Sequence, residues 1–420
     1  MTAPSFSIVL ATYNRGEHIR PTIESVLRQA WQAFELIVVG DGCDDSTEAT
    51  VRSFDDARVS WRNLPENSGS QSAPNNAGIE CARGEWIAYI GHDDIWAPDH
   101  LQRLRAVIDL DATVDFAISG CIFYGPEGSD FHSVTGIFDA SEAEGVALRH
   151  FFPPSSIAHR RDVTDRIGPW GAPETLQAAV DTDLLLRAAG GGLRFASTKK
   201  VTVHKFAAGH RYLSYLRPSS AEQIAMLRLL DRPDDGRVGR IVEDAKRTGQ
   251  FMWLRRQDLS KFGHGELFRR NQMNKGLRRA PLLPLSGRTV IAPTDDPRAL
   301  DWHRMERNRN YRWSGPNPCP KILIPYTGTA ARIAIEVVAT LPQTDLAGVS
   351  AFVEDQEVGC AVEAGEEGAY WLRFTAPLKS DDYTIVGLHT PAMGRPAELL
   401  RRRNNRKVGI AVGDIVLEPP

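Results

Sequence analysis

Short apolar runs alternate with amphipathic stretches through the first half of the chain. The apolar runs predict buried strands at residues 6–11, 34–39, 59–62 and 86–90. The intervening stretches carry apolar residues at helical spacing and predict helices at residues 19–32, 46–54 and 75–83. Strands that alternate with helices form a mostly parallel sheet with helices on both faces. The pattern therefore predicts an α/β domain, which we place at residues 1–212.

The pattern changes twice in the second half. Helical spacing dominates residues 213–287, where residues 222–288 hold fifteen Lys and Arg against eight Asp and Glu. From residue 288 the apolar period drops to two, in short runs separated by Gly, Pro and Asp. Such runs favour an antiparallel β-sandwich, of jelly-roll type, at residues 288–420. We expect the aromatic residues of this part to be core or interface residues rather than a sugar platform: Trp302, Tyr311, Trp313, Tyr370 and Trp371.

Composition narrows the class of protein without deciding its function. The 420 residues are 42% hydrophobic and 25% charged, as in soluble globular proteins, and the net charge of −3 gives no indication of a nucleic-acid partner. The five cysteines lack metal or redox spacing, and no apolar stretch is long enough to span a bilayer. We expect no signal peptide and a cytoplasmic protein. The basic helices are either solvated faces or a peripheral contact with the inner membrane, and they could support a homo-oligomer.

Candidate chemistry falls at the carboxyl ends of the predicted strands. Thr12, Tyr13, Asn14 and Arg15 follow the first strand, Asp41 follows the second, and Asp93 and Asp94 follow the fourth; these ends meet at the ligand crevice of an α/β sheet. Adjacent buried carboxylates need a positive partner, and a divalent cation bridging to a diphosphate suits them. Tyr13 can stack on a base, and Asp41 can accept from a ring N–H. The pattern indicates a nucleotide site, against the alternative of an Asp-rich turn that caps a helix.

The ordered motifs of this half resemble those of glycosyltransferase family 2. The resemblance covers about the first 210 residues and is carried by Ser7–Arg15, Glu35–Gly42, Asn67-Ser68-Gly69, Asn76-Ala77-Gly78, Ala82–Ile87, His92-Asp93-Asp94, Pro154-Ser155-Ser156, Arg166–Trp170 and Val180–Arg187. It implies a GT-A fold, which is Rossmann-like, and an inverting transfer of sugar from a nucleotide-diphosphate sugar.

The resemblance also implies roles for particular residues. Asp93 and Asp94 match the metal motif, which would hold Mn²⁺ or Mg²⁺; Asp41 matches the base-contacting acid, and Asp181 the catalytic base. Two positions depart from the family pattern: Gly91 replaces an acid before the metal pair, and Asn75 replaces an arginine. Neutralisation of the diphosphate then relies on the metal, Arg15 or His204. We expect His204 to be a metal ligand or an ordinary buried histidine.

Four further residues have two possible roles each. Asp181 is either the general base or a helix cap, and Asp183 either contacts the acceptor or pairs with Arg187 one turn along the helix. His92 either contacts the nucleotide or orients the acids beside it. Trp170 either stacks on the acceptor sugar or belongs to the core.

We therefore expect a metal-dependent inverting glycosyltransferase of bacterial cell-surface polysaccharide (for example lipopolysaccharide) synthesis. It would move a sugar, from a UDP-sugar above all, to a glycan or lipid-linked acceptor. The alternative is a non-catalytic glycan-binding or scaffold protein that retains the fold, which Gly91 and Asn75 motivate. A nucleotidyltransferase is disfavoured, because the loop Tyr13-Asn14-Arg15-Gly16 is not the basic glycine-rich loop that class needs.

Overall fold

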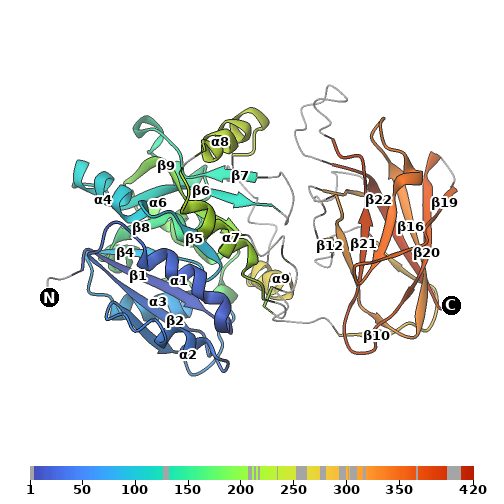
Figure 1. Cartoon of the computed structure of the whole chain (residues 1–420), viewed down its shortest axis with the longest axis horizontal. Helices are drawn as coiled ribbons and strands as arrows, with labels where there is room; N and C mark the ends of the chain where they lie inside the picture. Colours follow the sequence, from blue (N-terminus) through green and yellow to red (C-terminus); the bar gives the residue numbers. More distant parts are fainter. Residues whose placement is uncertain are drawn as a thin grey trace. The chain divides into compact units, whose positions relative to one another are not determined.

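The computed structural model describes residues 4–125, 132–206, 211, 214–215, 218–233, 235–251, 263–274, 281–292, 299–300, 302, 310–315, 318–365, 368–394 and 408–420. The chain forms two compact units, each with its own sheets (Figure 1). The first comprises the residues before 125, residues 132–206 and the described residues between 214 and 274, and the second begins before residue 281. We describe each unit by itself.

One half of the first sheet is parallel, as the sequence predicts. It contains β1 (Phe6–Thr12), β2 (Phe34–Gly40), β3 (Val59–Asn63) and β4 (Trp86–Tyr89), in the order β3-β2-β1-β4. Every residue of β2 and β4 is buried, as expected of parallel strands whose two faces are both covered. The carboxyl ends of β1, β2 and β4 therefore lie along one edge of the sheet, where the candidate residues were expected.

The other half of this sheet is mixed. β8 (Ile157–Arg160) runs antiparallel between β4 and β6 (Phe116–Tyr124), and β9 (Phe195–Phe206) lies parallel beside β6. β7 (His132–Thr135) pairs with β6, and the edge strand β5 (Asp94–Trp96) pairs antiparallel with β9. This last pairing places Asp94 opposite Lys205.

Helices cover both faces of the sheet, as Figure 1 shows. Alternate residues of β1 and β2 enter different hydrophobic clusters: Ile8 and Leu36 pack in one, Val9 and Ile37 in the other. The helices are α1 (Arg20–Leu27), α2 (Thr47–Arg52), α3 (Ser72–Cys81), α4 (His100–Leu110), α5 (Val163–Ile167) and α6 (Val180–Gly190). Short 3-10 turns lie at Gly16–Ile19, Ala140–Glu142, Val146–Leu148, Pro154–Ser156 and Pro173–Thr175.

The middle helices belong to the first unit. They are α7 (Ala221–Leu230), α8 (Arg237–Thr248) and α9 (Glu266–Asn274). Met226 and Ala245, from α7 and α8, are buried in one cluster with Ile122 of β6. In the part of the chain that the structure describes, no helix has both the length and the apolar character that crossing a bilayer requires.

The second unit is the predicted antiparallel sandwich. One sheet has the order β11-β22-β16-β20-β19, with β13 beside β22, and the other has the order β12-β14-β21-β17-β18. Apolar side chains of both sheets share one core, for example Ile333 and Leu372 with Val386. The bounds are β10 Leu283–Pro284, β11 Thr289–Ile291, β12 Ala299–Leu300, β13 Arg312–Trp313, β14 Lys321–Ile324, β15 Tyr326–Thr327, β16 Ala330–Ala339, β17 Ser350–Val353, β18 Gln356–Val358, β19 Ala361–Ala364, β20 Tyr370–Pro377, β21 Thr384–His389 and β22 Ala411–Glu418, with a 3-10 turn at Leu346–Gly348.

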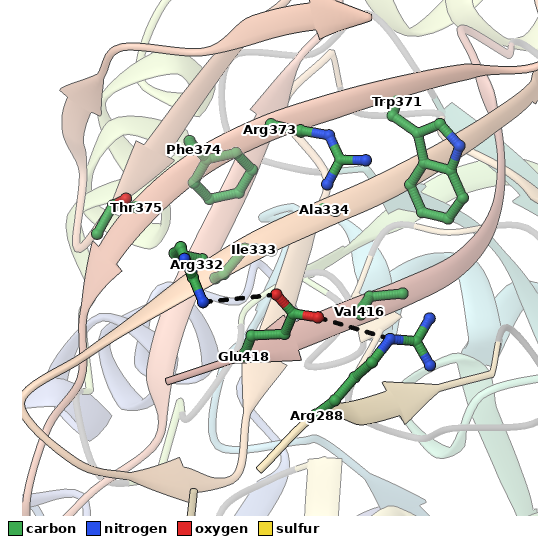
Figure 2. Close-up of a pocket in the computed structure, with 10 residues that line it drawn as sticks. All are labelled: Arg288, Arg332, Ile333, Ala334, Trp371, Arg373, Phe374, Thr375, Val416 and Glu418. Atoms are coloured by element: carbon green, nitrogen blue, oxygen red, sulfur yellow. Dashed lines mark ion pairs between the residues drawn. The ribbon is translucent and has the colours of Figure 1, made fainter. Parts of the chain in front are cut away.

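The strands of this sandwich alternate between core and outer face. In β20, Leu372 and Phe374 are buried whereas Arg373 and Thr375 are exposed. Figure 2 shows part of the outer face of the sheet that contains β16, β20 and β22. The short strand β10 pairs with β15, so the chain joins the second unit before residue 288, where the sequence pattern changes.

Candidate active site

Asp41 anchors the loop that follows β3. Its own N–H donates to the Thr12 carbonyl at 2.8 Å, which ties the ends of β1 and β2 together. Its carboxylate is 4% exposed and accepts from the backbone N–H groups of Ser68 and Gly69, each at 3.0 Å. Burial raises the pKa of Asp41, and these N–H donors oppose the rise. In this structure, then, Asp41 holds the 68–69 loop at the edge of the sheet.

The turn after β1 is fixed by reciprocal bonds to the turn after β2. Asn14 adopts a left-handed backbone, with φ of +43°, which asparagine tolerates better than most residues. Its amide donates to Asp44 at 2.6 Å, and its side-chain oxygen accepts from the Asp44 N–H at 3.1 Å. The N–H groups of Arg15 and Gly16 both donate to the Thr47 hydroxyl at 2.8 Å. These contacts fix the direction in which Tyr13 and Arg15 leave the sheet.

Tyr215 joins three of the predicted residues. Its ring lies 6.5 Å from the Tyr13 ring at an interplanar angle of 27°, and 5.4 Å from His92 at 75°. The Arg15 guanidinium lies 4.2 Å from the Tyr215 ring centre, and its Nη1 donates to the Ser214 carbonyl. Tyr13, Arg15 and His92 therefore converge as expected, around a residue that the sequence pattern did not single out.

Among the residues that the structure describes, several buried polar atoms at this edge have no hydrogen-bond partner within the protein. They are Thr12 Oγ1, Arg15 Nε and Nη2, Asn75 Nδ2, Asp94 Oδ1 and Ser214 Oγ. Arg15 is 5% exposed and Asn75 is 2% exposed. A buried polar atom without a partner costs about 1–3 kcal/mol, so such atoms gathered at one edge indicate a place where a polar ligand completes the bonding.

The two acids after β4 have different surroundings. Asp94 is fully buried, and its Oδ2 accepts from the Ser155 hydroxyl and from Lys205 Nζ, the latter at 2.8 Å. Burial raises the pKa of Asp94, and Lys205 opposes the rise; burial disfavours the Lys205 ammonium, but attraction to Asp94 and Asp93 outweighs it and raises the pKa of Lys205. Asp93 is half-buried, and its carbonyl accepts from Gln223 at 3.0 Å.

Gly91 lies directly beside these acids. A Cβ added there would be 2.8 Å from Asp94 Oδ2 and 3.3 Å from Asp93 Oδ1, and the Gly91 N–H donates to the Ser155 hydroxyl at 2.9 Å. An acid at this position would add a third negative side chain to the group. With glycine instead, the Lys205 ammonium balances Asp94.

The acids fit a divalent cation only in part. Among the residues that the structure describes, no three His, Cys, Asp or Glu side chains are placed to hold a metal ion together. Oδ2 of Asp94 is taken up by Ser155 and Lys205, whereas its Oδ1 is buried without a partner. Mg²⁺ is often bound by one or two carboxylates, with substrate phosphates and water as its other ligands. Asp93, with the unpartnered oxygen of Asp94 behind it, fits a cation bound in this way.

His204 lies on the other face of β9 from Lys205. Neighbouring strand residues point to opposite faces, so only one of the two can face Asp94, and that residue is Lys205. The His204 Nδ1 is 3.0 Å from the Tyr124 hydroxyl, the residue is 2% exposed, and burial lowers the pKa of His204 to about 4. The structure thus supports the buried-histidine alternative, and the expectation of a metal ligand is corrected.

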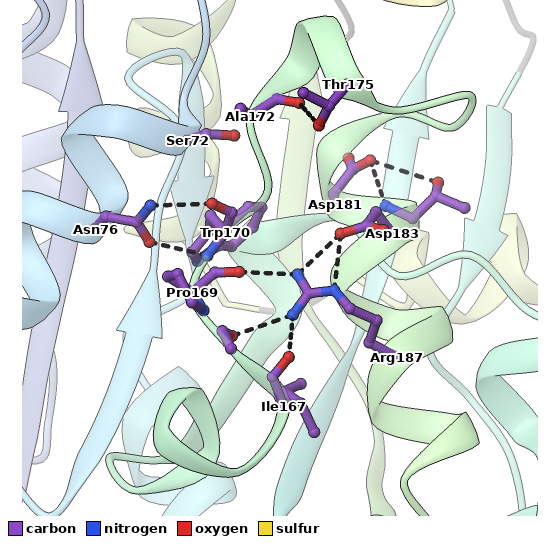
Figure 3. A network of polar contacts seen from close by, with 12 residues as sticks. Ser72, Asn76, Ile167, Pro169, Trp170, Ala172, Thr175, Asp181, Asp183 and Arg187 are labelled. Atoms are coloured by element: carbon purple, nitrogen blue, oxygen red, sulfur yellow. Dashed lines mark hydrogen bonds and ion pairs between the residues drawn. The ribbon is translucent and has the colours of Figure 1, made fainter. Parts of the chain in front are cut away.

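Trp170 is a core residue, which corrects its expected contact with the acceptor. It is 2% exposed, so its ring has no face on which a sugar could stack. Its backbone exchanges two hydrogen bonds with the Asn76 side chain, at 2.9 and 3.0 Å, as Figure 3 shows. Its indole N–H donates to the Tyr89 hydroxyl at 3.1 Å. Trp170 therefore fixes the segment before α6 to α3 and β4.

Two acids in the first turn of α6 have separate roles in this structure (Figure 3). Asp183 accepts from Arg187 Nε at 2.9 Å and Nη2 at 2.8 Å, and Arg187 also donates to the carbonyls of Ile167, Gly168 and Pro169. The predicted pairing within the helix is confirmed, and the acceptor contact of Asp183 stays a prediction. Asp181 accepts from the Thr182 N–H at 2.7 Å; the helix cap is Ala179, so Asp181 does not cap α6.

Three residues that complete the site were not predicted: Ser155, Lys205 and Tyr215. Lys205 follows His204 directly, and the alternation of a strand allows only one of them to face the acids. Which one does so depends on the pairing of β5 with β9, whose facing residues are 111 positions apart in the case of Asp94 and Lys205. Ser155 belongs to a motif quoted for the family resemblance, which was a usable signal.

Comparisons with known proteins agree with this fold. Residues 7–167 match the sequence model of the family described as Glycosyl transferase family 2. The uncharacterized glycosyltransferase YwdF of Bacillus subtilis is 30% identical over 187 residues, which are 44% of this chain and 67% of YwdF. The succinoglycan biosynthesis protein ExoO of Rhizobium meliloti is 42% identical over 101 residues. These residues are 24% of this chain and 29% of ExoO, so the chain matches less than a third of that relative.

Among solved structures, Staphylococcus aureus TarS matches with a TM-score of 0.42 and 14% identity, over 88% of this chain and 72% of TarS. The mixed sheet with helices on both faces is that of the GT-A fold class. The chain belongs to glycosyltransferase family 2.

Proposed function

We propose that this protein is an inverting glycosyltransferase that moves a sugar from a nucleotide-diphosphate sugar, UDP-linked above all, to a glycan or lipid-linked acceptor in polysaccharide synthesis. Membership of the family supports the reaction class, and similarity to the succinoglycan biosynthesis protein ExoO supports a polysaccharide product. The observation that carries the proposal is the group of unpartnered buried polar atoms at the carboxyl edge of β1 and β4.

The donor would complete the bonds that this edge leaves open. Arg15 Nε and Nη2 and Asn75 Nδ2 are N–H donors and suit the negative oxygens of a diphosphate. Tyr13 and Tyr215 offer ring faces to a base, next to the loop that Asp41 holds. A divalent cation, Mn²⁺ or Mg²⁺, held by Asp93 beside Asp94 would stabilise negative charge on the leaving diphosphate.

Asp181 is the proposed general base. It lies at the start of α6, in a segment that Trp170 and Arg187 fix to the sheet and to the preceding loop. Asp183, two residues further along α6, is held by Arg187 in an ion pair. Asp181 would take the proton of the acceptor hydroxyl as that oxygen attacks the anomeric carbon, and one displacement inverts the centre.

Nucleotide binding tests the donor site directly. Titration of the full chain with UDP, thymidine diphosphate and GDP, with Mn²⁺ present, should give one preferred base and a raised melting temperature. Arg15→Leu should weaken that binding about 10- to 100-fold because the diphosphate loses charge-assisted bonds. The free energy of unfolding without nucleotide should change by only about 1 kcal/mol, because removal of two buried N–H groups without partners offsets the lost bond to the Ser214 carbonyl. Arg20→Leu, at an exposed arginine, is the matched control.

Turnover then tests the catalytic role. Asp181→Asn should bind UDP like the parent protein and lose sugar transfer by about 10²- to 10⁴-fold, the usual contribution of a general base. Equal transfer by both proteins would contradict the assignment.

A non-catalytic glycan-binding or scaffold protein is the second candidate, because Lys205 already pairs with Asp94 and Gly91 contributes no acid. It would bind UDP with no sugar release in the parent protein.

A further inference from the structure

The second unit carries a trough of about 500 Å³ on the outer face of one of its sheets (Figure 2). Its lining comes from β16, β20 and β22 and from the residue before β11. The lining residues are Arg288, Arg332, Ile333, Ala334, Trp371, Arg373, Phe374, Thr375, Val416 and Glu418. The first unit contributes none of them, so the trough is a feature of the sandwich itself.

Short side chains between long ones create this trough. Ala334 pairs in register with Arg373 on one side and with Val416 on the other. Ala334 and Val416 are 6% and 7% exposed, although both lie on the outer face, because the longer side chains around them rise above them. The result is an apolar floor along the sheet with charged and aromatic walls.

The walls carry more positive than negative charge. Arg288, Arg332 and Arg373 line the trough with Glu418 as the single acid among its lining residues. Glu418 lies 3.6 Å from Arg288 and 3.7 Å from Arg332, distances too long for hydrogen bonds. The side chains of Arg288 and Arg332 are 63% and 62% exposed, so both guanidinium groups can reach a ligand in the trough.

Trp371 supplies an aromatic wall beside this charge. It lies on the outer face of β20 next to the buried Leu372, so it is not a core residue of the sandwich, the first of the two alternatives expected for it. The Arg373 guanidinium lies 5.6 Å from the Trp371 ring centre, and its Nε bonds Glu363 at 2.6 Å from the side of β19. An indole next to guanidinium groups combines stacking on a sugar ring with pairing to a negative group on that sugar.

We propose that this trough binds a saccharide chain that carries regularly spaced negative groups, with Trp371 against a sugar ring and Arg332 and Arg373 paired with the charges. An open sheet face suits an extended chain, and the small floor of Ala334 and Val416 leaves room for it. The proposed binding is inferred from the trough alone. The further inference that the bound saccharide is the acceptor rests on the proposed function. The trough would then hold an acceptor polymer while its end reacts elsewhere.

Calorimetric titration of the full chain with a galacturonate oligomer of about six sugars tests the proposal, with a neutral oligosaccharide of equal length and inorganic polyphosphate as comparison probes. We expect the galacturonate to bind, the neutral oligomer to bind at least 10-fold more weakly, and affinity to fall as salt rises. Trp371→Ala and the double variant Arg332→Gln/Arg373→Gln should each weaken binding about 10-fold or more. Lys321→Gln, on the other sheet, is the matched control.

Four results would overturn the proposal. The first is that galacturonate does not bind, and the second is that the Lys321 control loses as much affinity as the trough variants. The third is that the neutral oligomer binds as tightly as galacturonate. The fourth is that polyphosphate binds as tightly as galacturonate and that Trp371→Ala does not weaken its binding. The double variant replaces exposed side chains, so it keeps the test valid if the Trp371 variant does not fold. UDP affinity and release of sugar from the donor are measured on the same variants and should stay unchanged. If galacturonate does not bind but the donor is turned over, this inference fails and the proposed function stands. If galacturonate binds but the donor is not turned over, the proposed function fails and this inference stands.

Discussion

The edge of the first sheet and the trough of the second unit use polar residues in opposite ways. At the sheet edge, Arg15, Asn75 and Asp94 are almost fully buried and keep atoms without partners. In the trough, Arg288 and Arg332 are largely exposed, and both lie close enough to Glu418 to interact without hydrogen bonds. Burial makes the first arrangement costly unless a ligand completes it, whereas solvent makes the second inexpensive. The first is therefore the stronger indication of a specific small ligand, and the second suits a long ligand held by many weak contacts.

Lowering the pH should produce the largest difference in stability between the two units. The first unit buries His100, His159 and His204, whose pKa values burial lowers to about 3, 4 and 4, and the described residues of the second unit bury no histidine. The unfolded state binds these protons from about pH 6.5 downward and the native state does not, so stability falls as the pH drops from 6.5 towards 4. The loss is about 2 kcal/mol per imidazole at pH 5.

Urea unfolding at a series of pH values, followed by tryptophan fluorescence, measures this loss. His204→Gln should make the dependence on pH shallower. A first unit whose stability is flat between pH 6.5 and 5 would contradict the buried neutral state of these rings.

The Lys205–Asp94 pair is the next largest test of the comparison. Lys205→Met leaves Asp94 fully buried without its positive partner and should reduce the free energy of unfolding of the first unit by about 3–5 kcal/mol. The double variant Asp94→Asn/Lys205→Met removes both charges and should recover part of that loss. The measurement is the urea midpoint at neutral pH. A cost below about 1 kcal/mol would mean that the pair behaves like the exposed pairs of the trough.

The smallest effect is expected in the trough. The Glu418 side chain is 40% exposed and takes part in two long ion pairs. Glu418→Gln should therefore change the free energy of unfolding of the second unit by less than about 1 kcal/mol. The same change raises the positive charge of the trough and should tighten galacturonate binding. Weaker binding in this variant would show that Glu418 orients Arg288 and Arg332 rather than competing with the ligand.

Local patterns in the sequence were sufficient for the strands and for most residues at the sheet edge. The buried runs of β1, β2 and β4 and the polar residues directly after them are readable because a parallel strand with both faces covered is apolar throughout. The period of two in the second half likewise predicts the sandwich. Position along the chain thus placed Tyr13, Arg15, Asp41, Asp93 and Asp94 at one edge.

The residues that were misjudged depend on contacts between distant segments. Whether Trp170 faces a sugar or the core depends on Asn76 and Tyr89, and nothing in the residues around Trp170 shows those partners. His204 and Lys205 could be distinguished only with the register of β9 against β5. Trp371 was judged by residue type, although its alternation with Leu372 and Phe374 would have placed it on the outer face.

The position of Lys205 determines how long a fragment of the protein must be to contain both Asp94 and its counter-charge. The stretch that defines the family ends at residue 167, and the cation that balances Asp94 is supplied nearly forty residues later. A fragment cut at the family boundary would retain the acids yet lack their counter-charge and the strand that covers β5. During translation, Asp94 would therefore lack its positive partner until β9 had left the ribosome.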